Sequence, residues 1–483
     1  MASRTRTTNA PVPNAPYFAD LVQVACLLRR RDVSPVELTR IMLQRIEELD
    51  GQLKSFTCVT SDRALVMARN AEREISAGRY LGPLHGVPIA LKDVFDMSGV
   101  PTLGGLAVRR GTLALSDAHV VQNLEQAGAV LLGKLNMSEG AVAGYHPKFD
   151  VPVNPWNREY WSGISSSGCG VATAAGLCFA SVGTDTGGSI RIPSMANGVV
   201  GLKPTFGQIG RGGMLRLSKT FDHVGPMARR TRDAALVYEA LTQQVVLDRI
   251  DESISGIRIG LDSNFSLVDE DAGLVNAIEQ MLDVMRSLGA LVKEIRMPRG
   301  SNDLGRIWTT ITSYEAHQAY SKDYPQRSNE FGPYFRKVLE RGSRVNRSDY
   351  CAAHKPCFDY SGKFCELFED VDVIISPVGG VTPRLGTADP YGGPEEMRDL
   401  IDPERFRFVF PASISGMPAL SLPCGFSEDG MPYGIQIVGN HFSEALLCQI
   451  GHGFEEATKW HLKHPDLSPF RTQTEKCHTQ IAW

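Results

Sequence analysis

The chain has 483 residues, of which 42% are hydrophobic and 22% are charged, and its net charge is −4. This composition is ordinary for a folded globular protein and argues against a largely disordered chain. The slightly acidic balance lacks the basic surface of a nucleic-acid-binding protein, so no nucleic-acid partner is expected.

Signals for export and membrane insertion are weak along the sequence. Residues 1–16 lack the apolar core of a signal peptide, and we expect a flexible N-terminal tail there. The longest weakly polar run, residues 170–182, is too short to span a bilayer. The ten cysteines are widely scattered, which is typical of small buried hydrophobic residues and not of a disulfide framework. We therefore expect a cytoplasmic protein that does not bind membranes.

Apolar periodicity predicts alternating helices and strands through the first half of the chain. The predicted helices cover residues 18–49, 61–78, 119–127 and 171–175, and the predicted strands cover residues 87–94, 130–132 and 199–202. Within the first helical stretch, Ser34 followed by Pro35 is a good helix start.

The alternation continues through the second half. The predicted helices cover residues 232–241, 270–288 and 443–457, and the predicted strands cover residues 256–261, 290–295, 371–377, 419–423 and 434–438. Strands that alternate with helices from end to end predict a single α/β domain, residues 17–483, whose sheet is covered by helices on both faces. Residues 296–360 are rich in Tyr, Arg and Ser and are predicted to form a helical lobe over the pocket.

Three short runs, at residues 86–93, 165–168 and 183–189, supply Lys92, Ser165 and Ser189. A serine hydroxyl is a poor nucleophile near neutral pH and needs a base within hydrogen-bond reach. Lys92 lies in an otherwise apolar stretch, where burial would lower its pKa and yield a neutral amine that accepts a proton. Ser165 could relay that proton from Ser189, so the three residues together can perform acyl transfer.

Two glycines, Gly187 and Gly188, immediately precede Ser189. Without side chains in the way, backbone N–H groups there can stabilise the oxyanion of a tetrahedral intermediate. Each run also has a plainer interpretation, since a Lys-Asp pair after a strand is usually a surface ion pair and a Ser/Gly run is usually a loop. The run at 183–189 lacks the Gly-Lys-Ser/Thr ending of a phosphate-binding loop. The combination favours hydrolysis of an amide-type bond.

The run Gly-Thr-Asp-Thr-Gly-Gly-Ser-Ile-Arg-Ile-Pro-Ser at residues 183–194 is highly specific. Shorter supporting runs lie at residues 201–205, 222–226, 416–419 and 434–436. On these motifs the chain resembles the amidase signature family of serine hydrolases over residues 34–457. The resemblance implies one α/β domain around a large mixed sheet.

The same resemblance implies a role for each residue of the site. Ser189 would be the acyl-enzyme nucleophile, Ser165 the bridging serine, and Lys92 the base and later the acid. The implied oxyanion donors are the backbone N–H groups of Thr186, Gly187, Gly188 and Ser189. The implied supporting residues are Ser166, Asp185 and Arg191. No metal or cofactor is expected.

The serine loop departs from the usual family pattern at two positions. The family loop reads Gly-Gly-Ser-Ser-Gly-Gly, whereas residues 163–168 read Gly-Ile-Ser-Ser-Ser-Gly. The family's bridging serine usually follows a cis peptide bond, which here would join Ile164 to Ser165. Neither change removes a catalytic group, so we expect the activity to survive.

Substrate contacts are predicted by position along the chain. The acyl side is expected to be lined by residues 137–145, with Met137, Gly144 and Tyr145 as the named candidates. The loop 207–217 and the segment 310–335 are expected on the leaving-group side. The aromatic candidates are Tyr145, Trp308, Tyr314, Tyr320 and Phe331.

The leading hypothesis is a stand-alone hydrolase of hydrophobic or aryl amides. Carbamates (urethanes) and esters are compatible with the same acyl-enzyme chemistry. The sequence is also compatible with a homodimer. One alternative is the glutaminase-type amidase subunit of a tRNA-dependent amidotransferase, which would need a partner protein. Another is a non-catalytic binding protein on an amidase scaffold. A Cys-x-x-His-x-x-Cys run from Cys351 to Cys357 lacks a clear fourth zinc ligand and favours helix packing.

Overall fold

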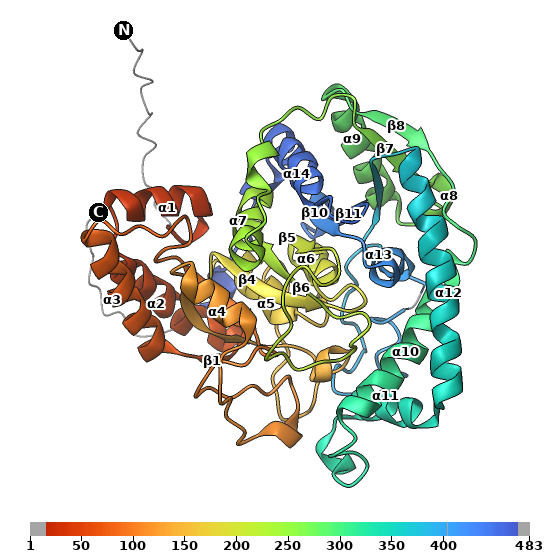
Figure 1. Cartoon of the computed structure of the whole chain (residues 1–483), viewed down its shortest axis with the longest axis horizontal. Helices are drawn as coiled ribbons and strands as arrows, with labels where there is room; N and C mark the ends of the chain where they lie inside the picture. Colours follow the sequence, from red (N-terminus) through yellow and green to blue (C-terminus); the bar gives the residue numbers. More distant parts are fainter. Residues whose placement is uncertain (1–15, 403, 472–483) are drawn as a thin grey trace.

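The computed structural model describes residues 16–402 and 404–471. The predicted N-terminal tail, residues 1–16, lies outside the described residues except for Pro16. Within the described ranges the chain forms one large α/β domain (Figure 1).

An eleven-stranded sheet with the order β1-β3-β2-β4-β6-β5-β10-β11-β9-β7-β8 forms the centre of the domain. Its strands are β1 (Phe56–Val59), β2 (Pro88–Lys92), β3 (Val130–Leu135), β4 (Ala180–Asp185), β5 (Val200–Lys203), β6 (His223–Ala228), β7 (Arg258–Leu261), β8 (Leu291–Glu294), β9 (Val373–Pro377), β10 (Ala419–Phe426) and β11 (Pro432–Gly439). The sheet is mixed, because β2 runs parallel to β3 and β4 whereas β4 runs antiparallel to β6. The predicted mixed α/β fold is confirmed.

Helices cover both faces of this sheet. They are α1 (Leu21–Arg30), α2 (Pro35–Leu53), α3 (Ser61–Ser76), α4 (His119–Gln126), α5 (Ser167–Ala174), α6 (Arg191–Asn197), α7 (Thr231–Thr242), α8 (Ser263–Ser266), α9 (Ala272–Ser287), α10 (Leu304–Ala319), α11 (Pro333–Arg344), α12 (Arg347–Glu366), α13 (Phe410–Ser415) and α14 (Glu444–Thr458). On β10, Leu420 packs against α14, and the next residue, Ser421, donates to the Arg191 carbonyl on α6. Successive strand residues point to opposite faces, so α14 and α6 lie on opposite sides.

The helical stretch predicted over residues 18–49 consists of two helices. Arg31 closes α1 in the left-handed conformation, with φ of 64°. Ser34 then starts α2 by accepting the backbone N–H groups of Val36 and Glu37, and Pro35 takes the first helical position. The helix start that the sequence predicted at Ser34 is therefore present, and it separates two helices.

Strand β4, which leads into the serine-glycine run, was not predicted. Its sequence, Ala-Ser-Val-Gly-Thr-Asp, has little hydrophobic periodicity, yet all six residues are buried. Its polar side chains are matched inside the protein: Ser181 donates to the Cys169 carbonyl, and Thr184 accepts from Lys92. Such pairing offsets the cost of burying polar groups, and it cannot be read from the strand alone.

The parallel pairing of β2 with β4 positions the reactive residues. Leu91 on β2 is in register with Val182 on β4. Because both strands run in the same direction, the residues that follow, Lys92 and Thr184, lie at the same edge of the sheet.

Helices α10, α11 and α12 occupy the stretch that includes residues 304–366 and lie together on one side of the domain (Figure 1). Helix α10 packs on both α11 and α12, and α12 packs on α13. In the part of the chain that the structure describes, no helix is both long and apolar enough to cross a membrane.

Candidate active site

Lys92 is fully buried at the end of β2 and makes two hydrogen bonds. Its Nζ donates to Ser165 Oγ at 2.7 Å and to Thr184 Oγ1 at 2.8 Å. Burial lowers the pKa of Lys92 from 10.5 to about 8, because the ammonium form loses its solvation. A substantial neutral fraction is thus available near pH 8, as a proton acceptor requires.

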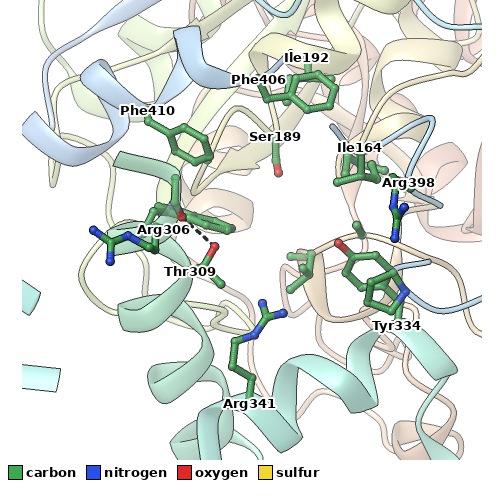
Figure 2. A pocket seen from close by; sticks show the side chains of 18 of the residues that line it. Ile164, Ser189, Ile192, Arg306, Thr309, Tyr334, Arg341, Arg398, Phe406 and Phe410 are labelled. Carbon is green, nitrogen blue, oxygen red and sulfur yellow. Dashed lines mark hydrogen bonds between the residues drawn. The ribbon is translucent and has the colours of Figure 1, made fainter. Parts of the chain in front are cut away.

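Ser189 lies at the edge of a cavity and is 9% exposed. Its hydroxyl points into the open space in Figure 2. Among the described residues, the Ser189 hydroxyl makes no side-chain hydrogen bond, and its backbone carbonyl accepts from the Ser166 N–H at 3.3 Å. This carbonyl contact ties the Ser189 turn to the serine loop that carries Ser165.

The turn before Ser189 offers fewer free amides than the sequence predicted. The Gly188 N–H already donates to Asp185 Oδ1 at 2.8 Å, which engages one of the four implied oxyanion donors. The backbone amides of Thr186, Gly187 and Ser189 donate to no group in the described residues. Gly187 lines the cavity, and an added Cβ there would come within 2.8 Å of Trp308.

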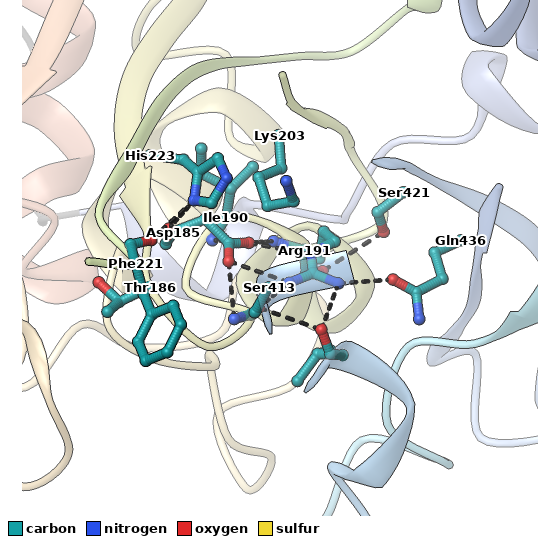
Figure 3. Close-up of polar contacts among 12 residues, drawn as sticks. Asp185, Thr186, Ile190, Arg191, Lys203, Phe221, His223, Ser413, Ser421 and Gln436 are labelled. Atoms are coloured by element: carbon teal, nitrogen blue, oxygen red, sulfur yellow. Dashed lines mark hydrogen bonds and ion pairs between the residues drawn. The ribbon is translucent and has the colours of Figure 1, made fainter. Parts of the chain in front are cut away.

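A fully buried ion pair holds this turn in place (Figure 3). Arg191 binds Asp185 through both Nε and Nη2, each at 3.0 Å. The remaining guanidinium donors reach the Val409 carbonyl at 3.0 Å, Gln436 Oε1 at 2.8 Å and Ser413 Oγ at 2.8 Å. Burial alone would raise the pKa of Asp185, but the charge and hydrogen bonds of Arg191 hold it well below its usual range.

His223 and Lys203 flank this ion pair. His223 Nδ1 lies 3.1 Å from the Asp185 carbonyl and 2.7 Å from the Phe221 carbonyl, so Nδ1 carries a proton and donates. Lys203 Nζ donates to the Met417 carbonyl at 2.5 Å. His223 thus binds the backbone at the start of the turn, and Lys203 binds the backbone just before β10. Burial holds the pKa of each well below its ordinary value.

We expect Asp185→Asn to lower the free energy of unfolding by about 3–5 kcal/mol, because it leaves the buried Arg191 charge without its counter-ion. Urea unfolding followed by fluorescence measures this loss. The matched control is Asp283→Asn, which breaks an exposed ion pair with Arg286 and should change stability by about 0.5 kcal/mol or less. Equal stabilities of the two variants would contradict the structural role given to Asp185.

The two departures in the serine loop have structural counterparts. The Ile164–Ser165 peptide bond is cis, and the Ile164 side chain forms part of the cavity wall. Ser167 Oγ lies 2.7 Å from the Tyr145 hydroxyl, in a hydrogen bond that a glycine could not make. Ser166 Oγ donates to the Thr184 carbonyl at 3.2 Å, which joins the loop to β4.

The cavity in front of Ser189 has a volume of about 650 Å³. Most of its walls are aliphatic or aromatic. The apolar lining consists of Ala141, Val142, Ala143, Ile164, Ile192, Trp308, Tyr334, Ile401, Phe406 and Phe410. Charged side chains at its mouth are Arg306, Arg341, Glu395 and Arg398. The cavity therefore combines an apolar interior with a charged rim.

The structure places the predicted substrate residues Met137, Gly144 and Tyr145 outside this lining. Met137 is fully buried in the core, and the Tyr145 hydroxyl is bonded to Ser167. An added Cβ on Gly144 would meet the Tyr334 side chain at 2.5 Å, so this glycine lies directly against a cavity wall. Residues 141–143, which belong to the predicted stretch 137–145, do form part of the wall.

Of the aromatic candidates, Trp308 lines the cavity. Tyr314 stacks on Tyr350, and Tyr320 packs edge-on against Phe331 within the core. The predicted loop 207–217 also lies outside the cavity lining. An aromatic side chain in the sequence can pack in the core or line a cavity, and position along the chain does not distinguish the two.

Sequence reasoning missed Thr184, Ser413 and the charged rim. Thr184 lies inside a run that the sequence had singled out, but nothing marked it as a partner of Lys92. Gln436, which binds Arg191, ends the supporting run at residues 434–436, and nothing in that run indicates its partner. A signal for Ser413 was absent, because it lies 222 residues from Arg191 along the chain.

The Cys-x-x-His-x-x-Cys run lies along helix α12, where Cys351 is exposed and Cys357 is buried. Among the described residues, no group of three or more His, Cys, Asp or Glu side chains is arranged to hold a metal ion.

Lys92 is buried and bonded to Ser165, and Ser189 faces an apolar cavity. These groups can supply a nucleophile and a proton acceptor without a histidine. The amidase family model matches residues 37–448, and the chain belongs to the amidase family. The resemblance found in the sequence is confirmed, and the chain is an amidase-type hydrolase of carbon–nitrogen bonds.

Individual relatives agree with this assignment. The putative amidase AmiD of Mycobacterium tuberculosis is 38% identical over 465 residues, which cover 93% of this chain and 96% of that protein. A glutamyl-tRNA(Gln) amidotransferase subunit of Synechococcus elongatus is 33% identical over 491 residues, covering 93% of this chain and 100% of that protein. The solved structure of the peptide amidase from Stenotrophomonas maltophilia has a TM-score of 0.80 at 27% identity, covering 93% of this chain and 98% of that one.

Proposed function

We propose that this protein is a stand-alone amidase that cleaves hydrophobic or aryl amides through an acyl-enzyme intermediate on Ser189. The observation that carries the proposal is the cavity, because Ser189 opens into about 650 Å³ lined mainly by aliphatic and aromatic side chains. Cavities of this size and lining suit small organic ligands of drug-like dimensions. Trp308, Phe406 and Phe410 provide flat surfaces against which an aryl group can pack.

The proposed first half-reaction forms a bond between Ser189 Oγ and the amide carbon. As the bond forms, the hydroxyl proton passes to Ser165 Oγ, and the Ser165 proton passes to neutral Lys92 Nζ. The 2.7 Å hydrogen bond between Lys92 and Ser165 supports this relay. The negative charge on the carbonyl oxygen is stabilised by backbone N–H groups of the turn, where the amides of Thr186, Gly187 and Ser189 remain free among the described residues.

Collapse of the tetrahedral intermediate breaks the carbon–nitrogen bond. The leaving amine takes the proton that Lys92 holds, returned through Ser165, and departs. Water then attacks the acyl-enzyme and gives a proton through Ser165 to Lys92. As the bond between the acyl carbon and Ser189 Oγ breaks, that proton returns through Ser165 to Ser189, and the carboxylic acid leaves. Esters would follow the same steps with an alcohol as the leaving group, and carbamates would follow them through a carbamoyl-enzyme. We therefore include both as further substrates.

The second candidate function is that of a glutaminase subunit in a tRNA-dependent amidotransferase. The 33% identity to a glutamyl-tRNA(Gln) amidotransferase subunit over that protein's whole length favours it. Free glutamine carries an ammonium group that needs an acidic partner inside the site. The lining acid, Glu395, lies exposed at the mouth and is paired with Arg398, which favours the stand-alone amidase.

The test compares hydrolysis of an aryl amide, an aryl carbamate, an aryl ester and free glutamine by the wild-type protein and by Ser189→Ala. We expect turnover of the aryl amide, with Ser189-dependent release of the arylamine measured by absorbance. Turnover of glutamine alone would overturn the stand-alone amidase and favour the amidotransferase function. Failure to turn over any substrate, together with failure to react with a fluorophosphonate, would favour a non-catalytic binding protein.

A further inference from the structure

Three arginines lie at the mouth of the Ser189 cavity, namely Arg306, Arg341 and Arg398. All three are exposed. One acid, Glu395, lies beside them and forms an ion pair with Arg398. The rim therefore carries a net positive charge, although the chain as a whole has a net charge of −4. Such a local reversal of sign attracts anions to this opening.

Arg341 differs from Arg398 in pairing and from Arg306 in direction. Within the described part of the chain, the Arg341 side chain makes no ion pair or hydrogen bond. The same is true of Arg306, whereas Arg398 is bound to Glu395. In Figure 2 its guanidinium points toward the centre of the cavity from the side opposite Ser189. The Arg306 guanidinium is turned away from that centre (Figure 2). Within the described residues, Arg341 is thus a free cation that faces the nucleophile across the cavity.

Helix α11 fixes the backbone position from which Arg341 projects. Tyr334 and Arg341 lie two turns apart on α11, and both line the cavity. The buried side chains of Phe335, Val338 and Leu339 anchor the helix in the core. Arg341 therefore projects from a rigid element rather than from a loop, so no backbone ordering is needed when it binds an anion.

We propose that Arg341 is a specificity-determining residue that binds a carboxylate of the substrate at a distance from the scissile amide. The proposal rests on the function proposed for Ser189 and names the substrate class more closely. A guanidinium presents its N–H groups in a planar fork that matches both oxygens of a carboxylate. The apolar walls between Arg341 and Ser189, which include Trp308 and Ile164, accommodate a hydrocarbon stem. The substrate is thus an amide with an apolar stem and an anionic end.

The test compares matched pairs of substrates. One set consists of the mono-para-nitroanilides of linear dicarboxylic acids of increasing length, each paired with the anilide of the monocarboxylic acid of equal length. A second set carries the carboxylate on the arylamine, as a carboxymethyl anilide paired with a methyl anilide. The two sets distinguish an anionic acyl group from an anionic leaving group. Wild type, Arg341→Gln and Arg344→Gln are measured at low and at high salt.

In the wild type, we expect kcat/KM for the best carboxylate substrate to exceed that of its neutral partner by about tenfold, with a preference that salt weakens. Arg341→Gln should lower kcat/KM for the carboxylate substrate by about threefold to fivefold, mainly through KM, because the site is partly exposed. The same substitution should leave kcat/KM for the neutral substrate unchanged. Arg344→Gln removes the same charge from the same helix, outside the cavity lining, and should change neither.

The inference would be overturned if charged and neutral partners had equal kcat/KM in both sets. It would also be overturned if Arg341→Gln lowered kcat/KM equally for both partners. Either result would leave the proposed function intact. Failure to hydrolyse any anilide would contradict the proposed function instead. In that case calorimetry with ω-phenylalkanoates and the matching neutral ω-phenylalkanols decides the inference. Carboxylate binding that Arg341→Gln weakens would support it, and equal binding of acid and alcohol would overturn it.

Discussion

Replacing Ser189 with alanine is expected to reduce amide turnover by about 10⁴-fold or more, because the acyl-enzyme can no longer form. The measurement is arylamine release under substrate saturation, together with covalent labelling by a fluorophosphonate detected by mass spectrometry. Label on Ser189 in the wild type and its absence in the variant would identify the nucleophile directly. Ser189 faces the cavity and makes no side-chain hydrogen bond with the described residues, so the substitution should leave the fold unchanged.

The matched control for this experiment is Ser415→Ala. Ser415 lies at the end of α13 and donates to the Pro411 carbonyl, away from the cavity lining. It should retain wild-type turnover and labelling. Retained turnover in Ser189→Ala, or a label on another serine, would show that the nucleophile had been assigned wrongly.

Lys92→Met is expected to lower kcat/KM by about 10²- to 10⁴-fold, the range that a positioned general base contributes. The wild-type pH profile gives a second readout. Because Lys92 must be neutral to accept a proton and its pKa is lowered to about 8, kcat/KM should rise with pH through an apparent pKa near 8. In Lys92→Met this rise should disappear from the residual activity. The exposed Lys355→Met is the control and should retain the wild-type profile.

Unfolding measurements separate the catalytic role of Lys92 from a structural one. Its pKa is about 8 in the folded protein and near 10.5 in the unfolded chain. The unfolded state therefore binds more protons between these values, so stability attributable to this group rises with pH in that window and is lowest below about pH 8. At pH 7, Lys92→Met removes a buried charge and should unfold near the wild-type temperature. A large drop in melting temperature would mean that loss of activity reflects loss of structure.

Lys92→Arg provides a further discriminating comparison. An arginine retains the positive charge but cannot lose its proton near neutral pH. If Lys92 acts by accepting a proton, this variant should be inactive at every pH tested. Activity in Lys92→Arg that matches the wild type would contradict the proposed role.

The sequence by itself predicted the amidase family, because the residues of the proposed site lie in short contiguous runs. Each of Lys92, Ser165 and Ser189 lies in a short run whose other residues suggest its role. Apolar neighbours predict that Lys92 is buried, and neighbouring glycines and serines predict tight turns around the two serines. Periodicity likewise predicted strongly patterned elements such as α9 and β9 close to their observed limits. The short polar strand β4 lacked such a pattern and was found only in the structure.

The tertiary structure alone decided which groups meet. Thr184 becomes a partner of Lys92 because β2 and β4 run parallel at neighbouring positions in the sheet. The Gly188 amide is engaged by Asp185, a contact that the order of residues does not reveal. Hydrophobic patterning tells which face of a helix is buried, but a buried face can meet either the core or a cavity. The walls of the Ser189 cavity and the Arg341 guanidinium come from segments far apart in the chain, so only their packing together defines what the site can bind.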